Sequence, residues 1–148
     1  MLTLGERHLE AIRRRARRAY PHECCGLLLG EATEGGARVR AALPARNLDP
    51  APRHGYFIDP RALLRGHRVA RRHRLQVVGY YHSHPDSPPA PSRRDAAEAL
   101  PGASYLILAV QGGAPAASRC FRRAREGAPL LAEELVVDEL MVEGPVIA

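Results

Sequence analysis

Two stretches of the sequence place apolar residues at the spacing of an amphipathic helix. The first stretch contains Leu4, Leu9, Ile12 and Ala16. It ends before Tyr20-Pro21, because proline disfavours helical backbone in the residue that precedes it. The second stretch begins at Asp59-Pro60, where aspartate suits the N-cap and proline suits the first helical position, and it runs to about residue 73. We expect this second helix to turn Leu63, Leu64 and Val69 inward.

Between and after these helices lie short apolar runs bounded by glycine, proline or polar residues, a pattern typical of strands. The runs are 24–30, 37–43, 56–58, 75–81, 104–111, 116–121 and 130–137. Gly35-Gly36 and Gly112-Gly113 supply the turns of two hairpins. Residues 44–52 form an irregular connection, and residues 92–100 form a short helix closed by Pro101-Gly102. Because strands and helices mix without strict alternation, the pattern predicts an α+β sheet flanked by helices.

Length and composition are those of an ordinary globular domain. With 148 residues, 45% of them apolar, we expect residues 1–148 to form a single domain. No apolar run approaches the ~20 residues that span a membrane, and residues 1–10 lack a signal-peptide pattern, so a cytoplasmic location is expected by default. The three cysteines are odd in number and two are adjacent, so we expect reduced, buried thiols.

The positive charge is carried entirely by arginine, because all 22 basic residues are Arg and the formal net charge is +6. The arginines cluster at residues 13–18 and 61–74, both in segments of helical periodicity. Such clusters can bind nucleic acid. However, charge on a helix usually forms a solvated face, and no aromatic residues interleave with these arginines to stack on bases. We therefore expect an acidic protein partner in preference to nucleic acid.

The strongest chemical signal is the pair His82 and His84, directly after the apolar run at 75–81. Side chains alternate along a strand, so these two imidazoles point the same way and can hold one ion between them. Ten residues, several of them proline, separate His84 from Asp95, enough to return a carboxylate to the histidines. Two imidazoles, one carboxylate and an open fourth position are typical of a catalytic zinc site. The pattern predicts a metal-dependent hydrolase.

Ser92 and Asp95 have a second explanation. Ser-x-x-Asp at a helix start is also a capping arrangement, with Ser92 at the N-cap and Asp95 three residues on. The two explanations are compatible for Ser92 but compete for Asp95, because a carboxylate bound to zinc has fewer lone pairs for a backbone N–H. Sequence spacing alone leaves both open.

A catalytic zinc also needs a nearby base to take the proton from its bound water. Spacing does not choose among the candidates Glu23, Glu31, Asp59, Asp86 and Glu98. Glu23 opens a predicted strand, where a side chain can be aimed into a site. A plain surface glutamate is the alternative explanation for the same residue.

Taken together, these motifs resemble the JAMM/MPN+ metalloprotease family, in particular its stand-alone bacterial and archaeal members. The motifs are Pro-His-Glu-Cys-Cys-Gly-Leu-Leu-Leu-Gly at 21–30, His82-Ser83-His84-Pro85, Ser92 and Asp95, with further likenesses at 56–60, Gly79 and 101–107. The likeness covers about residues 6–121, and six motif positions in order make it specific. The resemblance implies a JAMM/MPN-like fold, with a curved mixed β-sheet flanked by helices.

The resemblance also implies roles for the motif residues. His82, His84 and Asp95 would hold one zinc ion, with water as the fourth ligand. Glu23 would act as the general base and later pass its proton to the leaving amine, and Ser92 would hydrogen-bond the tetrahedral oxyanion. Because every motif position matches the family, we expect catalysis and not a pure scaffold role.

The same resemblance indicates a substrate class. Members of the family cleave amide or isopeptide bonds that follow the C-terminal Gly-Gly of ubiquitin or ubiquitin-like proteins. The short spacing around Asp95 indicates that insertions for ubiquitin chains are absent, so a ubiquitin-like sulfur carrier is the expected partner. Its C-terminal tail would be trimmed, or freed of an attached amino acid such as cysteine. Two alternatives are a non-catalytic interaction module stabilised by its metal and, less favoured, an arginine-rich nucleic-acid-associated protein.

Overall fold

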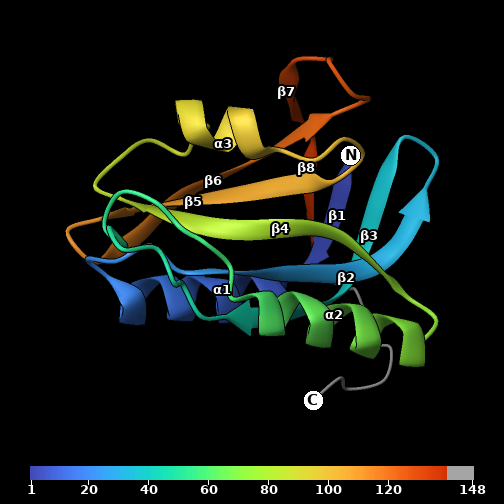
Figure 1. Cartoon of the computed structure of the whole chain (residues 1–148), viewed down its shortest axis with the longest axis horizontal. Coiled ribbons are helices and arrows are strands. Elements are labelled where there is room, and N and C mark those ends of the chain that lie inside the picture. Colours follow the sequence, from blue (N-terminus) through green and yellow to red (C-terminus); the bar gives the residue numbers. More distant parts are fainter. Residues whose placement is uncertain (140–148) are drawn as a thin grey trace.

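The computed structural model describes residues 1–139, which form one eight-stranded mixed sheet with helices packed against it (Figure 1). In chain order the elements are β1 (Leu2–Gly5), α1 (Glu6–Ala19), β2 (Cys25–Thr33), β3 (Gly36–Ala45), α2 (Pro60–Arg72), β4 (Gln76–Pro85), α3 (Arg93–Glu98), β5 (Ser104–Gln111), β6 (Ala114–Arg123), β7 (Leu130–Glu133) and β8 (Leu135–Asp138). The strand order is β7-β6-β5-β4-β2-β3-β1-β8. β4 pairs in parallel with β5, whereas β2 pairs antiparallel with both β3 and β4. The predicted α+β architecture is confirmed.

The sheet is strongly curved because the chain joins its two edges. Only Glu134 separates β7 from β8, yet these strands lie at opposite ends of the strand order. The N-terminal amine of Met1 lies 3.1 Å from a carboxylate oxygen of Glu133, and the amide of Leu2 donates to the carbonyl of Glu134 at 2.8 Å. The two ends of the sheet therefore meet beside the N-terminus.

Alternation along the strands divides the core into two layers. In β2, Leu28 packs in the layer beneath α1, whereas Leu27 and Leu29 belong to the layer beneath α2. All three leucines are fully buried, and each such side chain contributes about 1.5–3 kcal/mol through the hydrophobic effect. The central strands are thus fixed from both faces, which gives the residues at their ends a rigid support.

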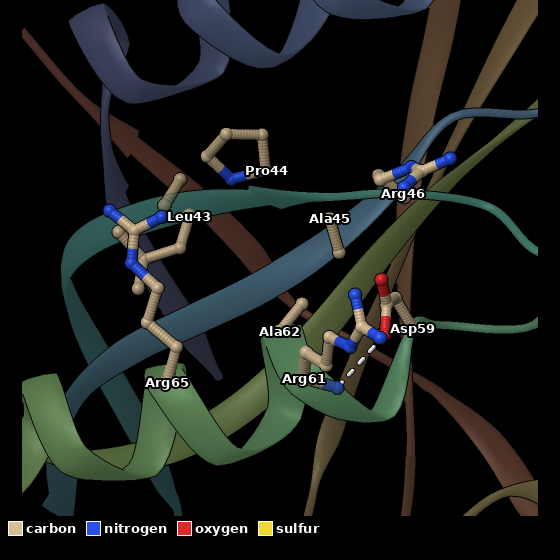
Figure 2. A pocket seen from close by; sticks show the side chains of 9 residues that line it. Leu43, Pro44, Ala45, Arg46, Asp59, Arg61, Ala62 and Arg65 are labelled. Carbon is tan, nitrogen blue, oxygen red and sulfur yellow. Dashed lines mark hydrogen bonds between the residues drawn. The ribbon is translucent and has the colours of Figure 1, made fainter.

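The N-terminus of α2 forms as predicted, with the Asp59 carboxylate accepting from the amide of Arg61 at 2.9 Å (Figure 2). Beside it, a hollow of about 460 Å³ separates this turn from the end of β3. Arg46, Arg61 and Arg65 line the hollow, and all three are exposed, as expected for arginines on a solvated face. Asp59, one of the five candidate bases, lines it, but none of Glu23, His82, His84, Ser92 and Asp95 does.

Two predictions about individual leucines in the N-terminal half, Leu4 and Leu64, were wrong. Leu4 belongs to β1 and not to the first helix, which begins at Glu6. Leu2 and Leu4 are both fully buried at the sheet, so their alternation reflects a strand and not a helix. Leu64 is 53% exposed because it lies about 100° around α2 from the half-buried Leu63.

Two predicted strands also differ from the structure. Residues 56–58 form no strand, and Ile58 makes only an isolated bridge with Asn47. The amide of Phe57 donates to the side-chain oxygen of Asn47 instead of to a neighbouring strand. The single strand expected at 130–137 is divided at Glu134, whose two flanking strands pair with opposite edges of the sheet. The hairpin at Gly112-Gly113 is confirmed, and both glycines have positive φ as a tight turn requires.

The predicted state of the cysteines is confirmed, because Cys24, Cys25 and Cys120 are all buried and free. Within residues 1–139, no helix is both long and apolar enough to cross a membrane.

Candidate metal centre

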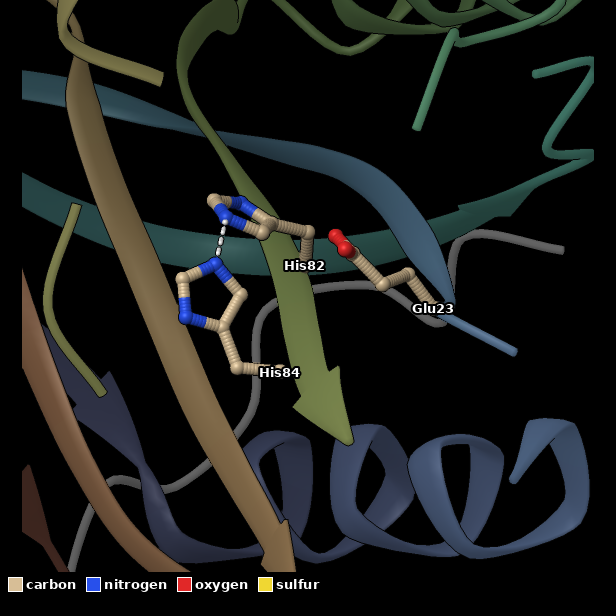
Figure 3. Close-up of side chains that lie close together, drawn as sticks. All are labelled: Glu23, His82 and His84. Carbon is tan, nitrogen blue, oxygen red and sulfur yellow. Dashed lines mark hydrogen bonds between the residues drawn. The ribbon is translucent and has the colours of Figure 1, made fainter. Parts of the chain in front are cut away.

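His82 and His84 lie near the end of β4, the central strand between β2 and β5. Their side chains share one face, as the alternation predicted, and their Nε2 atoms are 3.1 Å apart (Figure 3). Both residues are buried, with relative exposures of 0% and 7%. Two imidazole nitrogens this close in a buried position are suited to face one shared cation.

Asp95 completes a triangle of donor atoms with these histidines. Its Oδ2 lies 3.2 Å from Nε2 of His82 and 3.1 Å from Nε2 of His84. A tetrahedral zinc ion with ligand bonds of ~2.0 Å spaces its donors by ~3.3 Å, close to all three sides of this triangle. Imidazole nitrogen and carboxylate oxygen are ligands that zinc accepts. The residues present therefore fit the ion that the sequence predicted.

Neighbouring groups determine the tautomer of His84 and the orientation and charge of the His82 ring. Nδ1 of His84 lies 2.9 Å from the carbonyl of Pro88, so this nitrogen carries the hydrogen and leaves the lone pair on Nε2. The ring of His82 stacks on Tyr56, with centroids 4.4 Å apart. Burial lowers the pKa of His82, which favours the neutral imidazole that a metal requires.

The carboxylate of Asp95 is aimed by the start of α3. The hydroxyl oxygen of Ser92 accepts from the amide of Asp95 at 3.0 Å, and Oδ2 of Asp95 accepts from the amide of Ser92 at 2.9 Å. The capping box is thus present, and the same Oδ2 faces both imidazoles. Burial favours a raised pKa for Asp95, but the imidazoles of His82 and His84 beside its carboxylate outweigh burial and hold the pKa below its usual range.

Glu23 lies at the entrance to β2, opposite the histidines (Figure 3). The register pairs Cys25 with His82 across the sheet, which brings Glu23 alongside His84. Its carboxylate and the two imidazoles offer ligand atoms that all lie within 4.8 Å of one another. The side chain is buried, and burial raises the pKa of Glu23 to about 7. Glu23 is thus in reach of whatever the histidines and Asp95 bind.

The other four carboxylates considered as a base have different surroundings. Glu31 is exposed on β2, and Asp59 caps α2. Asp86 accepts from a tyrosine hydroxyl and a main-chain amide, whereas Glu98 is ion-paired with an arginine of its own helix. The geometry thus favours Glu23 among the five candidates.

Asn47, which the sequence reasoning missed, fastens the main chain of Glu23. Its amide nitrogen donates to the carbonyls of Glu23 at 3.0 Å and Gly55 at 3.1 Å. Its oxygen accepts from two main-chain amides of the same loop, both at 3.0 Å. The amide of Glu23 in turn donates to the carbonyl of Pro52 at 2.7 Å. An Asn-x-Asp-Pro sequence typical of an Asx turn was the available signal.

Ser83 and Arg94 connect site residues to neighbouring segments through hydrogen bonds and an ion pair, and the sequence did not predict this role for either. The hydroxyl of Ser83 accepts from the amide of Cys24 at 2.8 Å, and its own amide donates to the Cys24 carbonyl at 3.1 Å. This links the histidine strand to the residue that follows Glu23. Arg94, next to Asp95, forms an ion pair with Asp49 and donates to a carbonyl of the same loop.

Comparison with known proteins identifies the family. Residues 5–124 match the family described as "Prokaryotic homologs of the JAB domain". The chain belongs to this family. The JAB/MPN relationship inferred from the motifs is thereby confirmed.

Three curated relatives carry descriptive names. The chain is 36% identical over 104 residues to a "Probable TtuB-protein conjugate cleaving protease" of Thermus thermophilus. This alignment covers 70% of this chain and 67% of the relative. It is 38% identical over 93 residues to the "Desampylase" of Haloferax volcanii, with coverages of 62% and 66%. It is 33% identical over 97 residues to the "CysO-cysteine peptidase" of Mycobacterium tuberculosis, with coverages of 65% and 64%. The matched segments thus span about two thirds of each relative's own length.

Solved structures agree with the fold. A protein of Desulfitobacterium hafniense superposes with a TM-score of 0.81 at 31% identity, covering 94% of each chain. A JAB1/MPN domain protein of Archaeoglobus fulgidus superposes with a TM-score of 0.57 at 19% identity, covering 93% of this chain and 96% of that one. The second likeness shows the fold alone, and it confirms the JAB/MPN-like architecture.

Proposed function

We propose that this chain is a zinc-dependent peptidase that hydrolyses the amide bond after the C-terminal Gly-Gly of a ubiquitin-like or sulfur-carrier protein. The observation that carries this proposal is the triangle of donor atoms from His82, His84 and Asp95, with sides of 3.1–3.2 Å, beside the buried carboxylate of Glu23. Three ligands and an adjacent base are the arrangement of a catalytic zinc site and not of a closed structural one.

The site residues divide the chemistry between them. When bound, zinc lowers the pKa of water toward ~7 and polarises a carbonyl group. Glu23 takes a proton from the attacking water and returns it to the nitrogen as the C–N bond breaks, which yields a carboxylate and an amine. The oxygen of Ser92 is engaged by the Asp95 amide, so its hydroxyl hydrogen is left to donate to the developing oxyanion.

The names of the relatives support the substrate class. One is named for cleaving TtuB–protein conjugates, one as a desampylase, and one as a peptidase of CysO-cysteine. Two of these names pair a protein, TtuB or CysO, with what is joined to it and name the enzyme for cleaving the pair, which supports a carrier protein as the substrate here. The tail of such a carrier is therefore the partner that we propose for this chain.

Mass spectrometry tests the proposal directly. A bacterial sulfur-carrier protein extended past its Gly-Gly end by one cysteine is incubated with the zinc-loaded chain, with and without a zinc chelator. Chelator-sensitive loss of the mass of the added residue is expected. An intact adduct in both arms, together with retained zinc, would instead favour the non-catalytic interaction module.

A further inference from the structure

Two separate hollows adjoin the site, each lined by some of its residues. One, of about 240 Å³, is mostly apolar, and Phe57, Leu63 and Leu100 line it together with Asp95. The other, of about 360 Å³, has the more polar lining of the two and is called the polar hollow; Glu23, Arg53 and His84 are among its lining residues. The two hollows share no lining residue, so a substrate that crosses the site places one of its halves in each.

The position of Glu23 decides which half lies where. In amide hydrolysis the nitrogen must gain a proton as the C–N bond breaks, so the leaving amine must lie within reach of the proton carrier. Glu23, to which the proposed function gives that role, lines the polar hollow and not the apolar one. Ser92, the proposed donor to the oxyanion, also lines the polar hollow, so the scissile carbonyl lies at the rim of that hollow. The leaving amine therefore belongs in the polar hollow, and the rest of the acyl tail belongs along the apolar one.

The polar hollow contains a permanent cation, Arg53, whose charge acts on the nearby Tyr20 but which forms no ion pair among the described residues. Arg53 is exposed, and within residues 1–139 its guanidinium forms neither a hydrogen bond nor an ion pair. Asp86, which follows the histidine strand, does not pair with it, because its two carboxylate oxygens accept from the Tyr20 hydroxyl at 2.7 Å and the Gly112 amide at 2.8 Å. Glu23 is the only carboxylate among the residues that line this hollow.

We infer that Arg53 selects leaving groups that carry a carboxylate next to the released amine, so that the preferred product is a free amino acid and not the side chain of a protein lysine. This inference rests on the proposed function and specifies its substrate. Guanidinium binds carboxylate through paired N–H donors, and a hydrogen bond between charged groups is stronger than a neutral one. The amine of a lysine in an isopeptide bond has no carboxylate beside it.

The test uses one carrier protein with three different groups after its Gly-Gly end. The first group is cysteine with a free carboxylate, the second is the same cysteine as its carboxamide, and the third is a peptide joined through a lysine side chain. The full, zinc-loaded chain is expected to cleave the free acid with a kcat/KM about ten- to a hundredfold above that of the carboxamide, the range of one charge-assisted hydrogen bond.

Variants assign this preference to Arg53. R53Q should lower kcat/KM for the free acid to near that for the carboxamide and affect the carboxamide much less, whereas R53K should restore part of the preference. R125Q removes an equally exposed arginine from outside the hollow and should behave as wild type. In an E23Q background, which is expected not to turn over, calorimetry should show the same preference in binding affinity.

Three outcomes would overturn the inference. They are equal rates on acid and carboxamide, a faster rate on the lysine-linked peptide, and an equal loss on both cysteine substrates in R53Q. Each of these leaves the proposed peptidase function in place, because cleavage is still observed. Absence of cleavage of all three substrates by zinc-loaded protein would reject the proposed function, and this inference with it.

Discussion

Replacing Asn47 by aspartate tests whether the loop after β3 sets the position of Glu23. The substitution retains the oxygen that accepts from two loop amides and removes the nitrogen that donates to the carbonyls of Glu23 and Gly55. Each such hydrogen bond contributes a net ~1 kcal/mol, and the new carboxylate oxygen also repels the two carbonyls that it faces, so the substitution costs at least about 2 kcal/mol of unfolding free energy. Alanine removes all four, and the expected cost rises to about 4 kcal/mol.

Loss of the hydrogen bond to the Glu23 carbonyl should also lower the catalytic rate. If the carbonyl of Glu23 loses its tether, the carboxylate of this residue shifts relative to His84, and a shift on the order of 1 Å can cost ~10²-fold in rate. We therefore expect Asn47→Asp to lower kcat by between about tenfold and a hundredfold while KM changes little. Zinc affinity should stay close to wild type, because none of the proposed ligands contacts Asn47.

Denaturant unfolding, zinc titration and steady-state kinetics on a carrier adduct measure these three quantities. Leu48→Ala is the matched control, since Leu48 is the next residue in the loop and is 44% exposed, and its effect on stability should stay within about 0.5 kcal/mol. A variant that loses about 2 kcal/mol of stability but keeps the wild-type kcat would show that Asn47 supports the loop without positioning Glu23.

Substitutions at four further positions separate the proposed roles. Glu23→Gln should abolish turnover and retain zinc, and loss of zinc by metal analysis would mean that Glu23 is a ligand. Asp95→Ala or His84→Ala should lower zinc occupancy and activity together, so normal occupancy in either would contradict the assigned ligand set. Ser92→Ala should bind zinc normally and lose about 10²–10³ in kcat, whereas Ser92→Thr, which keeps the hydroxyl, should recover most of the rate. Equal rates for Ala and Thr would remove Ser92 from the chemistry.

Much of the fold was predictable because local patterns and tertiary packing agree in most elements. The cap at Asp59, the hairpin at Gly112-Gly113 and the helix end before Pro21 each follow from a residue whose backbone preference is strong. The predictions were wrong where contacts with distant parts of the chain determine the local structure. β1 is four residues long, too short for a period to be distinguished, and the division at Glu134 depends on which sheet edge each half meets.

The pairing of the two histidines was predictable for a different reason. His82 and His84 are two positions apart on one strand, so the period of the strand alone brings their side chains together. Glu23 was not fixed by spacing, because its approach to His84 depends on the register between β2 and β4. Asn47 was missed because its importance lies in four hydrogen bonds that only the folded loop reveals.

The start of α3 shows why two explanations of one motif need not exclude each other. The sequence set the capping role of Asp95 against its role as a ligand, on the ground that a carboxylate has few lone pairs. In the structure Oδ2 accepts from the Ser92 amide and also faces both imidazoles, so the cap holds the carboxylate in the orientation that a metal needs. Two carboxylate oxygens offer about four lone-pair positions, which is enough for one amide and one ion. The helix cap thus orients Asp95 in the proposed metal site, because hydrogen bonds to a ligand fix the geometry with which it meets the metal.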